Sequence, residues 1–177
     1  MRQVQVAHTA DLDAQTLKAA NALLHDAFEG DWTADDWDHA RGGLHVLVWD
    51  ADDLIGHGAV VLRRLLHAGR ALRTGYVEGV GVRADRRGQG HGAALMTEVE
   101  RIIRAGYELG ALGASDDGAR IYLARGWQCW RGPSFALTPT GIQRTADEDG
   151  NIYVLQASAP LDLDAELTCD WRDGEVW

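Results

Sequence analysis

Three apolar runs in the first half of the chain constrain its fold more than any other feature. Leu44–Trp49, Leu54–Leu66 and Ala71–Val82 are separated only by the short turn segments Ala51–Asp53 and His67–Arg70. Strands joined by turns this short must run antiparallel, because a parallel pair needs a crossover of about a dozen residues or more. The sequence therefore predicts an antiparallel three-stranded meander in this region.

Segments with helical spacing surround the meander. Leu12–Phe28 carries apolar residues three and four positions apart, and Thr33 with Asp36 is typical of a helix start, so a short helix through Ala40 is expected. Further helices are predicted at about 90–107 and 118–125, and further strands at 4–8, 109–114, 127–130 and 152–156. This order predicts an α/β fold with one mixed sheet, in a single domain over 1–177.

The charge of the chain limits its partners. Its 27 acidic and 17 basic residues give a formal net charge of −10, which argues against nucleic acid as the main partner. Acidity favours a cationic substrate, although it is also common among ordinary soluble proteins. The N-terminal residues lack the apolar run of a signal peptide, and no stretch is long enough to span a bilayer, so we expect a cytoplasmic protein without membrane contact.

No metal site is predicted. Cys129 and Cys169 lie far apart and fit no metal or redox spacing, so both are expected to be reduced thiols. Six histidines also lack metal spacing and are interpreted as core or surface residues. They are His8, His25, His39, His45, His57 and His67.

The segment from Val82 to Gly92 leads from a predicted strand into a predicted helix and is rich in glycine and arginine. Glycines at 88, 90 and 92 allow unusual φ angles and close approach of a ligand to the backbone. The free N–H groups and the dipole at the start of a helix favour an anion. Arg83, Arg86 and Arg87 add positive charge. The segment therefore predicts a phosphate-binding loop, with an exposed glycine-rich turn as the plainer alternative.

Two common phosphate loops do not fit this segment. A Walker A loop ends in Gly-Lys-Ser/Thr, whereas this chain has His91-Gly92-Ala93. A dinucleotide-binding loop follows the first strand of a parallel βαβ unit, and here an antiparallel meander precedes the loop.

The segment Arg87–Gly92 resembles the Arg/Gln-x-x-Gly-x-Gly/Ala motif of the GNAT N-acetyltransferases. A second family motif, Ala-x-x-x-Tyr-x-x-x-Gly-aromatic, is matched by Ala119–Trp127. The resemblance implies the GNAT fold, a mostly antiparallel central sheet flanked by helices. It also implies acetyl-CoA bound in the splay between the two central strands, and a homodimer.

The resemblance extends to the actinobacterial aminoglycoside 2′-N-acetyltransferases over nearly the whole chain. It is carried by Gly30–Thr33, Gly75–Val80, Asp147–Gly150 and the C-terminal segment from Cys169 to Trp177. It implies acetyl transfer from acetyl-CoA to the 2′-amine of an aminoglycoside, and hence antibiotic resistance.

The resemblance assigns roles to particular residues. Val80, Gly81 and Val82 would contact the pantetheine arm and the thioester carbonyl. The pyrophosphate would bind Arg87, Gly88, Gln89, Gly90, His91 and Gly92. Tyr122 would donate a proton to the leaving thiolate. Glu78 lies two residues before Val80 and so shares its face of a regular strand, where a carboxylate could accept the amine proton.

An aminoglycoside is a polycation, so its site should carry carboxylates. Among several acidic clusters, the resemblance singles out Asp31, Asp36, Glu78, Gly79, Asp147, Glu148 and the Trp177 carboxylate. The alternative for many of these acids is a solvated surface. Trp32 and Trp37 could stack on sugar rings, with core packing as the alternative. Gly113 stands where the family has a serine that contacts substrate, and Ser115 could replace it.

Two other functions remain open at this point. One is a GNAT acetyltransferase for another small amine or a protein N-terminus. The other is a non-catalytic CoA-binding module, against which the presence of both Glu78 and Tyr122 argues.

Overall fold

The computed structural model describes residues 2–177, apart from the side chains of Asp116 and Asp117, and divides the chain into two compact units. The first, here called the N-terminal unit, extends to Val61 and includes Val77–Ile102. The C-terminal unit consists of Leu62–Tyr76 and Ile103–Trp177. Strands β3 (Asp53–His67) and β4 (Arg70–Val82) and helix α3 (His91–Gly106) contribute residues to both units.

The N-terminal unit contains the antiparallel strands that the apolar runs predict. β1 (Arg2–His8) pairs with β2 (Leu44–Asp50) from Arg2↔Asp50 to His8↔Leu44, and β2 pairs antiparallel with β3. Val46, Leu47 and Val48 in β2 are fully buried. Burial of these consecutive residues shows that both faces of β2 are covered, because successive strand residues point to opposite faces.

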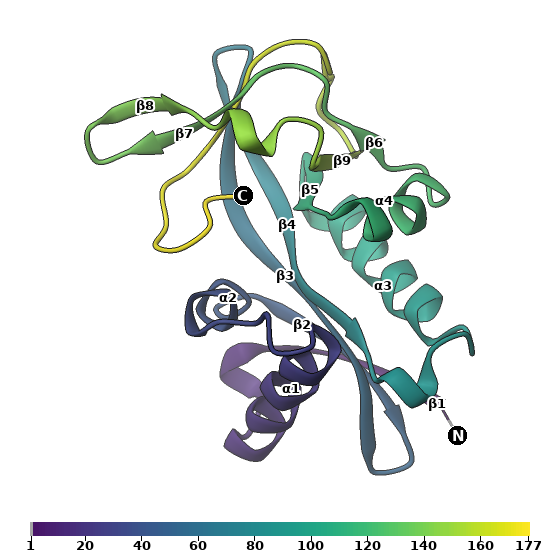
Figure 1. Ribbon diagram of the computed structural model, residues 1–177. Coiled ribbons are helices and arrows are strands. Elements are labelled where there is room, and N and C mark those ends of the chain that lie inside the picture. Colours follow the sequence, from purple (N-terminus) through teal and green to yellow (C-terminus); the bar gives the residue numbers. More distant parts are fainter. Residues whose placement is uncertain (1) are drawn as a thin grey trace. The chain divides into compact units, whose positions relative to one another are not determined.

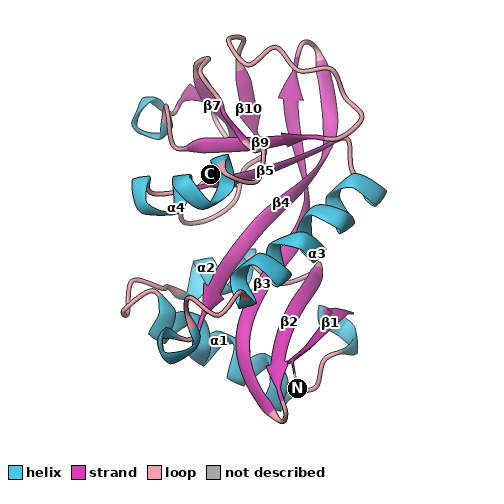
Figure 2. Cartoon of the chain, turned by 90° about the vertical axis from the view of Figure 1, so that its right-hand side faces the viewer, coloured by secondary structure: helices cyan, strands magenta, loops and turns pink. Residues whose placement is uncertain are grey.

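Helices cover both faces of these strands. On one face, a Cβ added to Gly81 of β4 would lie 3.1 Å from Leu24 of α1 (Ala14–Ala27). On the other face, a Cβ added to Gly58 of β3 would lie 2.9 Å from Leu95 of α3. Figures 1 and 2 show α1 and α2 (Ala34–His39) on one side of β3 and α3 on the other.

Local capping explains where the first two helices begin. The Asp13 carboxylate accepts a hydrogen bond of 2.7 Å from the Thr16 amide at the start of α1. Thr33 and Asp36 form a reciprocal capping box at the start of α2, as their spacing predicts.

The C-terminal unit is built around the other halves of β3 and β4. Its strand order is β6-β9-β5-β4-β3-β10-β7-β8. The further elements are β5 (Leu109–Gly113), α4 (Asp116–Leu123), β6 (Gln128–Cys129), β7 (Ser134–Thr138), β8 (Gly141–Arg144), β9 (Ile152–Gln156) and β10 (Leu167–Cys169). β4 pairs parallel with β5, and β5 pairs antiparallel with β9, beside which the C-terminus lies in Figure 2. Trp127 and Trp130 are among its largest fully buried side chains.

The paired register of β4 and β5 is short. It covers Thr74–Tyr76 opposite Leu109–Ala111, although β4 continues to Val82. Beyond Tyr76, β4 is therefore no longer paired with β5. The residues Val80–Val82, which the family resemblance assigns to acetyl-CoA, lie in this later part of β4.

The structure confirms the predicted fold class, a mixed sheet flanked by helices, and each predicted helix and strand. It adds three short strands, β7, β8 and β10, which were not predicted. It also adds three short 3-10 helices, Thr9–Asp11, Ala84–Arg86 and Ala146–Glu148. None of the helices that the structure describes is long and apolar enough to cross a membrane.

Candidate active site

The predicted phosphate loop connects β4 to α3 in the N-terminal unit. Gly88 and Gly90 have φ angles of +75° and +81°, in the left-handed region that favours glycine. A Cβ added to Gly88 would meet no atom within 4 Å, so the space above this part of the backbone is open. The amide of Ala94 donates to the Gly90 carbonyl, so the amides just before it lie in the first turn of α3, where intrahelical acceptors are lacking. This geometry suits a pyrophosphate.

The arginines of the loop already have partners within the protein. Arg83 donates to the Asp85 carboxylate at 2.7 Å, and Arg86 donates to the Asp50 carboxylate at 2.7 Å. Arg87 donates to two backbone carbonyls, those of Val82 and Ala27, at 3.1 and 3.2 Å. These contacts fix the loop against β2, β4 and α1, a role that the sequence pattern did not reveal.

A fourth arginine reaches the loop from the N-terminal strand. A guanidinium nitrogen of Arg2 lies 3.4 Å from the Gly90 carbonyl oxygen, to which it donates, and its side chain is exposed. Sequence reasoning missed Arg2 because its place beside the loop depends on the β1–β2 pairing and not on any local motif.

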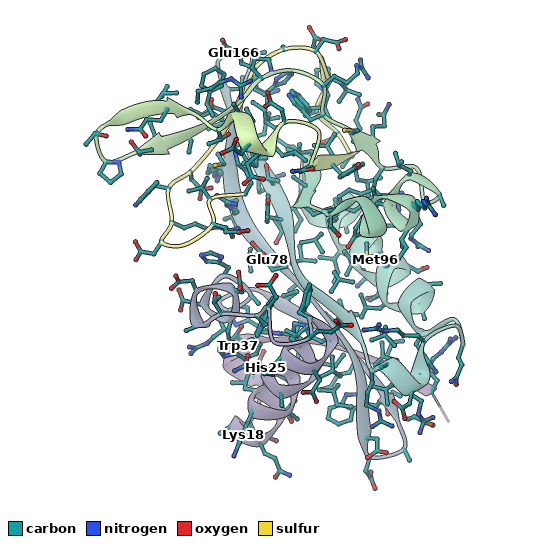
Figure 3. All side chains as sticks on the ribbon, viewed as in Figure 1. Lys18, His25, Trp37, Glu78, Met96 and Glu166 are labelled. Carbon is teal, nitrogen blue, oxygen red and sulfur yellow. The ribbon has the colours of Figure 1, made fainter. Side chains whose placement is uncertain are left out.

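The end of β4 carries the predicted base and the predicted donor contacts. Glu78, labelled in Figure 3, and Val80 are half-buried, and Gly79 lies between them with φ +56°. A left-handed residue interrupts the strict alternation of a strand, so counting residues does not by itself place Glu78 and Val80 on one face. The shared face of these two residues therefore stays a prediction.

Gly79 is in a crowded position. A Cβ added there would lie 3.0 Å from both Leu24 and Trp32 and 3.5 Å from a ring nitrogen of His57. The Gly79 carbonyl accepts a hydrogen bond of 2.8 Å from His57 Nδ1. Both the positive φ and the crowding therefore require glycine at this position.

The two acids predicted near the start of α2 differ in their surroundings. Asp31 is exposed, whereas Asp36 is half-buried. One Asp36 carboxylate oxygen accepts hydrogen bonds of 2.7 Å from both the amide and the hydroxyl of Thr33. Asp36 therefore stabilises α2 in addition to any role in binding a substrate.

A groove of about 660 Å³ lies between α1 and α2 in the same unit. Trp32 and Trp37 both line it, and Figure 3 shows Trp37 on α2 with Lys18 and His25 on α1. Trp32 stacks on Phe28 with ring centroids 5.2 Å apart. Lys18, Arg41 and Asp38 also line the groove, so two cationic side chains outnumber one carboxylate, which does not favour a polycation. Sugar stacking by the two tryptophans therefore stays a prediction.

Tyr122 lies on α4 in the C-terminal unit. Its ring meets that of Trp127 edge-on, with centroids 5.8 Å apart. Burial raises the pKa of Tyr122 to about 12, so the phenol stays protonated at neutral pH. A protonated hydroxyl is what a proton donor requires.

The predicted acids Asp147 and Glu148 lie on the 3-10 helix Ala146–Glu148 of the C-terminal unit. Burial, and then the neighbouring carboxylates of Glu175 and Asp147, raise the pKa of Glu148. Asp149 differs, because hydrogen bonds from Arg144 lower its pKa to about 2. Asp147 and Glu148 thus belong to an acidic cluster with Glu175, and Asp149 belongs to an ion pair.

Trp177 is buried, and its indole N–H donates to the Thr145 hydroxyl at 2.9 Å. Thr145 directly precedes the 3-10 helix that carries Asp147 and Glu148. A Cβ added to Gly113 of β5 would lie 3.6 Å from the main-chain carbonyl carbon of Trp177. Within this unit, the structure therefore brings Trp177 next to Gly113 and to the segment with the predicted acids. Figure 2 shows the end of the chain near β5.

Among the side chains that the structure describes, no group of three or more His, Cys, Asp or Glu residues could hold a metal ion. Cys129 and Cys169 are free thiols.

Comparison with known proteins places the chain in a family. Residues 9–130 match the family described as acetyltransferase (GNAT) domain. The chain is 48% identical over 181 aligned residues to an aminoglycoside 2′-N-acetyltransferase of Mycolicibacterium fortuitum, and the alignment covers 100% of this chain and 93% of that protein.

Solved structures with low identity share the fold. One is the GNAT family N-acetyltransferase YhbS of Escherichia coli in complex with CoA, with a TM-score of 0.66, 19% identity and coverage of 95% of this chain and 89% of that one. Another is Escherichia coli ElaA, with a TM-score of 0.62, 19% identity and coverage of 88% and 100%. On the family match and the full-length relative, the chain belongs to the GNAT family of acetyltransferases.

Proposed function

We propose that this protein transfers the acetyl group of acetyl-CoA to the 2′-amino group of aminoglycosides and so confers resistance to them. The observation that carries the proposal is the 48% identity over the whole chain to the aminoglycoside 2′-N-acetyltransferase of Mycolicibacterium fortuitum. The amine attacks the thioester directly while both substrates are bound, and no covalent enzyme intermediate is required.

The donor side of the proposal rests on the N-terminal unit. The loop from Arg87 to Gly92 would hold the pyrophosphate, because it offers open backbone, two left-handed glycines and the start of α3. Val80, Gly81 and Val82 would hold the pantetheine arm and the thioester carbonyl. Acetyl-CoA supplies the activated acetyl group, and the protein supplies the orientation and the proton transfers.

Glu78 and Tyr122 are the proposed proton carriers. Glu78 accepts the proton that the amine loses, directly or through water. Tyr122 donates to the thiolate that leaves. Because burial raises the pKa of Tyr122 to about 12, the phenol is protonated at neutral pH, and the phenolate left after the transfer must regain a proton from solvent before the next turnover.

On the acceptor side, we propose that carboxylates bind the ammonium groups of the aminoglycoside. The proposed set is Asp31, Asp36, Glu78, Gly79, Asp147, Glu148 and the Trp177 carboxylate. The raised pKa of Glu148 supports its inclusion, because a cation would relieve the repulsion between Glu148, Glu175 and Asp147.

Two aminoglycosides test the regiospecificity. Tobramycin carries an amine at position 2′, whereas kanamycin A carries a hydroxyl there and amines elsewhere. Thiol release from acetyl-CoA should be at least about 100-fold faster with tobramycin, because kanamycin A has no amine at the 2′ position and its other amines are not held in line with the thioester. NMR of the product should place the acetyl group at 2′. Equal rates with both aminoglycosides would refute the 2′ assignment.

The protein is further proposed to act as one domain, in the cytoplasm, as a homodimer. The family match over residues 9–130 includes residues of both compact units, which supports a single functional domain. The free thiols of Cys129 and Cys169 suit the reducing cytoplasm. Leu137 and Ile142, opposite each other on β7 and β8, are 45% and 59% exposed and would be covered in a dimer. Sedimentation of wild type and Ile142→Glu tests this, and a wild-type monomer would refute it.

A further inference from the structure

Two buried histidines connect the Gly79 carbonyl to a threonine near the N-terminus. His57 Nδ1 lies 2.8 Å from the Gly79 oxygen, and His57 Nε2 lies 2.9 Å from His45 Nδ1. His45 Nε2 in turn lies 2.7 Å from the Thr9 hydroxyl oxygen. Both histidines are 0% exposed. All four residues belong to the N-terminal unit, and each of the four ring nitrogens has a partner.

The partners fix where the protons lie. The Gly79 carbonyl can only accept, so His57 Nδ1 carries a proton and a neutral His57 accepts at Nε2. That acceptor requires a proton on His45 Nδ1, which leaves His45 Nε2 to accept from the Thr9 hydroxyl. Thr9 itself accepts from the Gly42 amide at 2.9 Å, and its alternative acceptor, the Gly43 carbonyl, is farther away at 3.4 Å.

This chain of hydrogen bonds requires a neutral His57. A second proton on His57 would lie on Nε2 and face the Nδ1–H of His45 across the 2.9 Å contact, whereas a second proton on His45 would face the Thr9 hydroxyl. Burial lowers the pKa of each histidine to about 4, so both rings are neutral at physiological pH. The ring centroid of Trp37 lies 6.2 Å from the ring centroids of both imidazoles. The order of donors and acceptors is therefore fixed, and the hydrogen bond to Gly79 has one direction.

The target of this chain of hydrogen bonds is the strand that carries the proposed chemistry. The Gly79 carbonyl and the Val80 amide belong to one planar trans peptide group, so the Val80 N–H points opposite to the carbonyl that His57 holds. Gly79 has φ +56°, where no regular sheet geometry fixes the orientation of this peptide. The hydrogen bond from His57 therefore also sets the direction of the Val80 N–H.

We propose that Thr9, His45 and His57 are positioning residues that orient the Gly79–Val80 peptide so that the Val80 N–H faces the thioester carbonyl. This inference rests on the proposed function, in which Val80 contacts that carbonyl. The three residues touch no substrate and transfer no proton. They act by holding a backbone donor ready for the oxygen on which negative charge develops.

Two substitutions of His57 separate positioning from simple structural support. His57→Phe keeps the ring and removes the donor, whereas His57→Asn offers an N–H at nearly the place of Nδ1. We expect His57→Phe to lower kcat by about 10-fold or more, below the roughly 10²–10³-fold cost of losing an oxyanion donor outright. KM for acetyl-CoA should change little, and His57→Asn should recover most of kcat.

A matched control exists in the other unit. His67 is also buried, accepts from the Asp162 amide and contacts the Glu166 carbonyl, but it has no contact with Gly79 among the bonds described. His67→Phe should lower stability and leave kcat near the wild-type value. Thr9→Val, at the less buried end of the chain of hydrogen bonds, is the mildest variant and should lower kcat a few-fold.

An NMR measurement provides a readout that does not depend on activity. In the wild-type protein at pH 7, ¹⁵N shifts of both imidazoles should show the Nδ1–H tautomer. The Val80 amide resonance should move in His57→Phe and return toward its wild-type position in His57→Asn. A wild type that acetylates no aminoglycoside would refute the proposed function, yet the tautomers and the Val80 resonance would still report on the positioning.

Three results would overturn the positioning role. One is an Nε2–H tautomer at either histidine, or a charged His57 ring, at pH 7. Another is wild-type kcat in both His57→Phe and Thr9→Val. The third is His57→Asn no more active than His57→Phe although both are folded, because a donor at the Nδ1 position would then not matter.

Discussion

Glu78 carries a carboxylate next to the peptide that His57 orients, and its proposed role is to accept a proton from the amine. Glu78→Gln keeps the size and hydrogen-bonding capacity of the side chain and removes the base. We expect kcat with tobramycin to fall about 10²–10⁴-fold at neutral pH. Steady-state kinetics at pH 7 measures this effect.

Asp52, an exposed acid in the turn between β2 and β3, provides the control for Glu78. Asp52→Asn removes the same charge from the same unit and should leave kcat unchanged. If Glu78→Gln kept the wild-type kcat, Glu78 would not be the base.

Asp36 has two separable roles, capping α2 and the proposed binding of an ammonium group. Asp36→Asn keeps an oxygen that can accept from Thr33 but removes the charge. It should raise KM for tobramycin about 5-fold, the effect of losing one partly exposed ion pair, and change stability little. Thr33→Ala breaks the cap and should lower the free energy of unfolding by about 1 kcal/mol without changing KM. If Thr33→Ala also raised KM for tobramycin, capping and substrate binding would not be separable at Asp36.

At the scale of single residues, sequence reasoning succeeded where the signal is local. The spacing of Thr33 and Asp36 predicts the cap that the structure shows. It failed for Arg87, whose guanidinium donates to the Val82 and Ala27 carbonyls, because no local pattern reveals those acceptors. It also treated His45 and His57 only as core or surface residues, since their hydrogen bond depends on the diagonal placement of β2 and β3 residues.

Gly79 shows how the course of β4 depends on a missing side chain. Gly79→Ala should destabilise the protein through the left-handed φ of +56° and through contacts at 3.0 Å with Leu24 and Trp32. Gly69→Ala is the control, because Gly69 has φ +75° but nothing within 4 Å of an added Cβ. We expect the free energy of unfolding to fall by about 1–2 kcal/mol in Gly69→Ala and by about 1–3 kcal/mol more in Gly79→Ala. Urea unfolding measures both losses. Equal losses would show that the contacts around Gly79 add no cost.

The hydrogen-bonded histidines of β2 and β3 should make stability depend on pH. Burial lowers the pKa of His45 and His57 to about 4, with His8 and Arg41 adding a smaller effect at His45. The unfolded chain, with histidine pKa near 6.5, binds protons that the folded state does not. The stabilisation is therefore complete above pH 6.5 and is lost as pH falls toward 4, by up to about 3 kcal/mol for each ring.

Urea unfolding at pH 7, 5.5 and 4.5 tests this dependence by comparing the wild type with the double variant His45→Phe/His57→Phe. The wild type should lose more stability with falling pH than the double variant, because only the wild type carries the two buried rings. Parallel losses would show that other groups cause the acid sensitivity.

At the scale of elements, strands with a strong local pattern were predictable and strands defined by distant partners were not. The apolar runs of β2, β3 and β4 identified the meander. β10 has three residues, and its partners are Leu66 of β3 and the strand β7, which no local pattern can indicate. β7 and β8 form a hairpin in which all four β8 residues are exposed, so β8 lacks the apolar alternation that marks a half-buried strand.

For the molecule as a whole, the net charge of −10 should act on the two substrates in opposite ways. A polycationic aminoglycoside is attracted by the acidic protein, and anionic acetyl-CoA is repelled except near the start of α3 and its arginines. The Debye length falls from about 30 Å at 0.01 M salt to about 10 Å at 0.1 M, so added salt screens both effects. We expect kcat/KM for tobramycin to fall about 10-fold between 0.01 and 0.3 M salt, while kcat/KM for acetyl-CoA stays level or rises.

Glu148→Gln removes one acid of the cluster with Asp147 and Glu175. It should reduce the salt dependence of kcat/KM for tobramycin and leave that for acetyl-CoA unchanged. A tobramycin slope of zero in the wild type would mean that the acidic residues are a solvated surface and that the acceptor is selected by uncharged contacts.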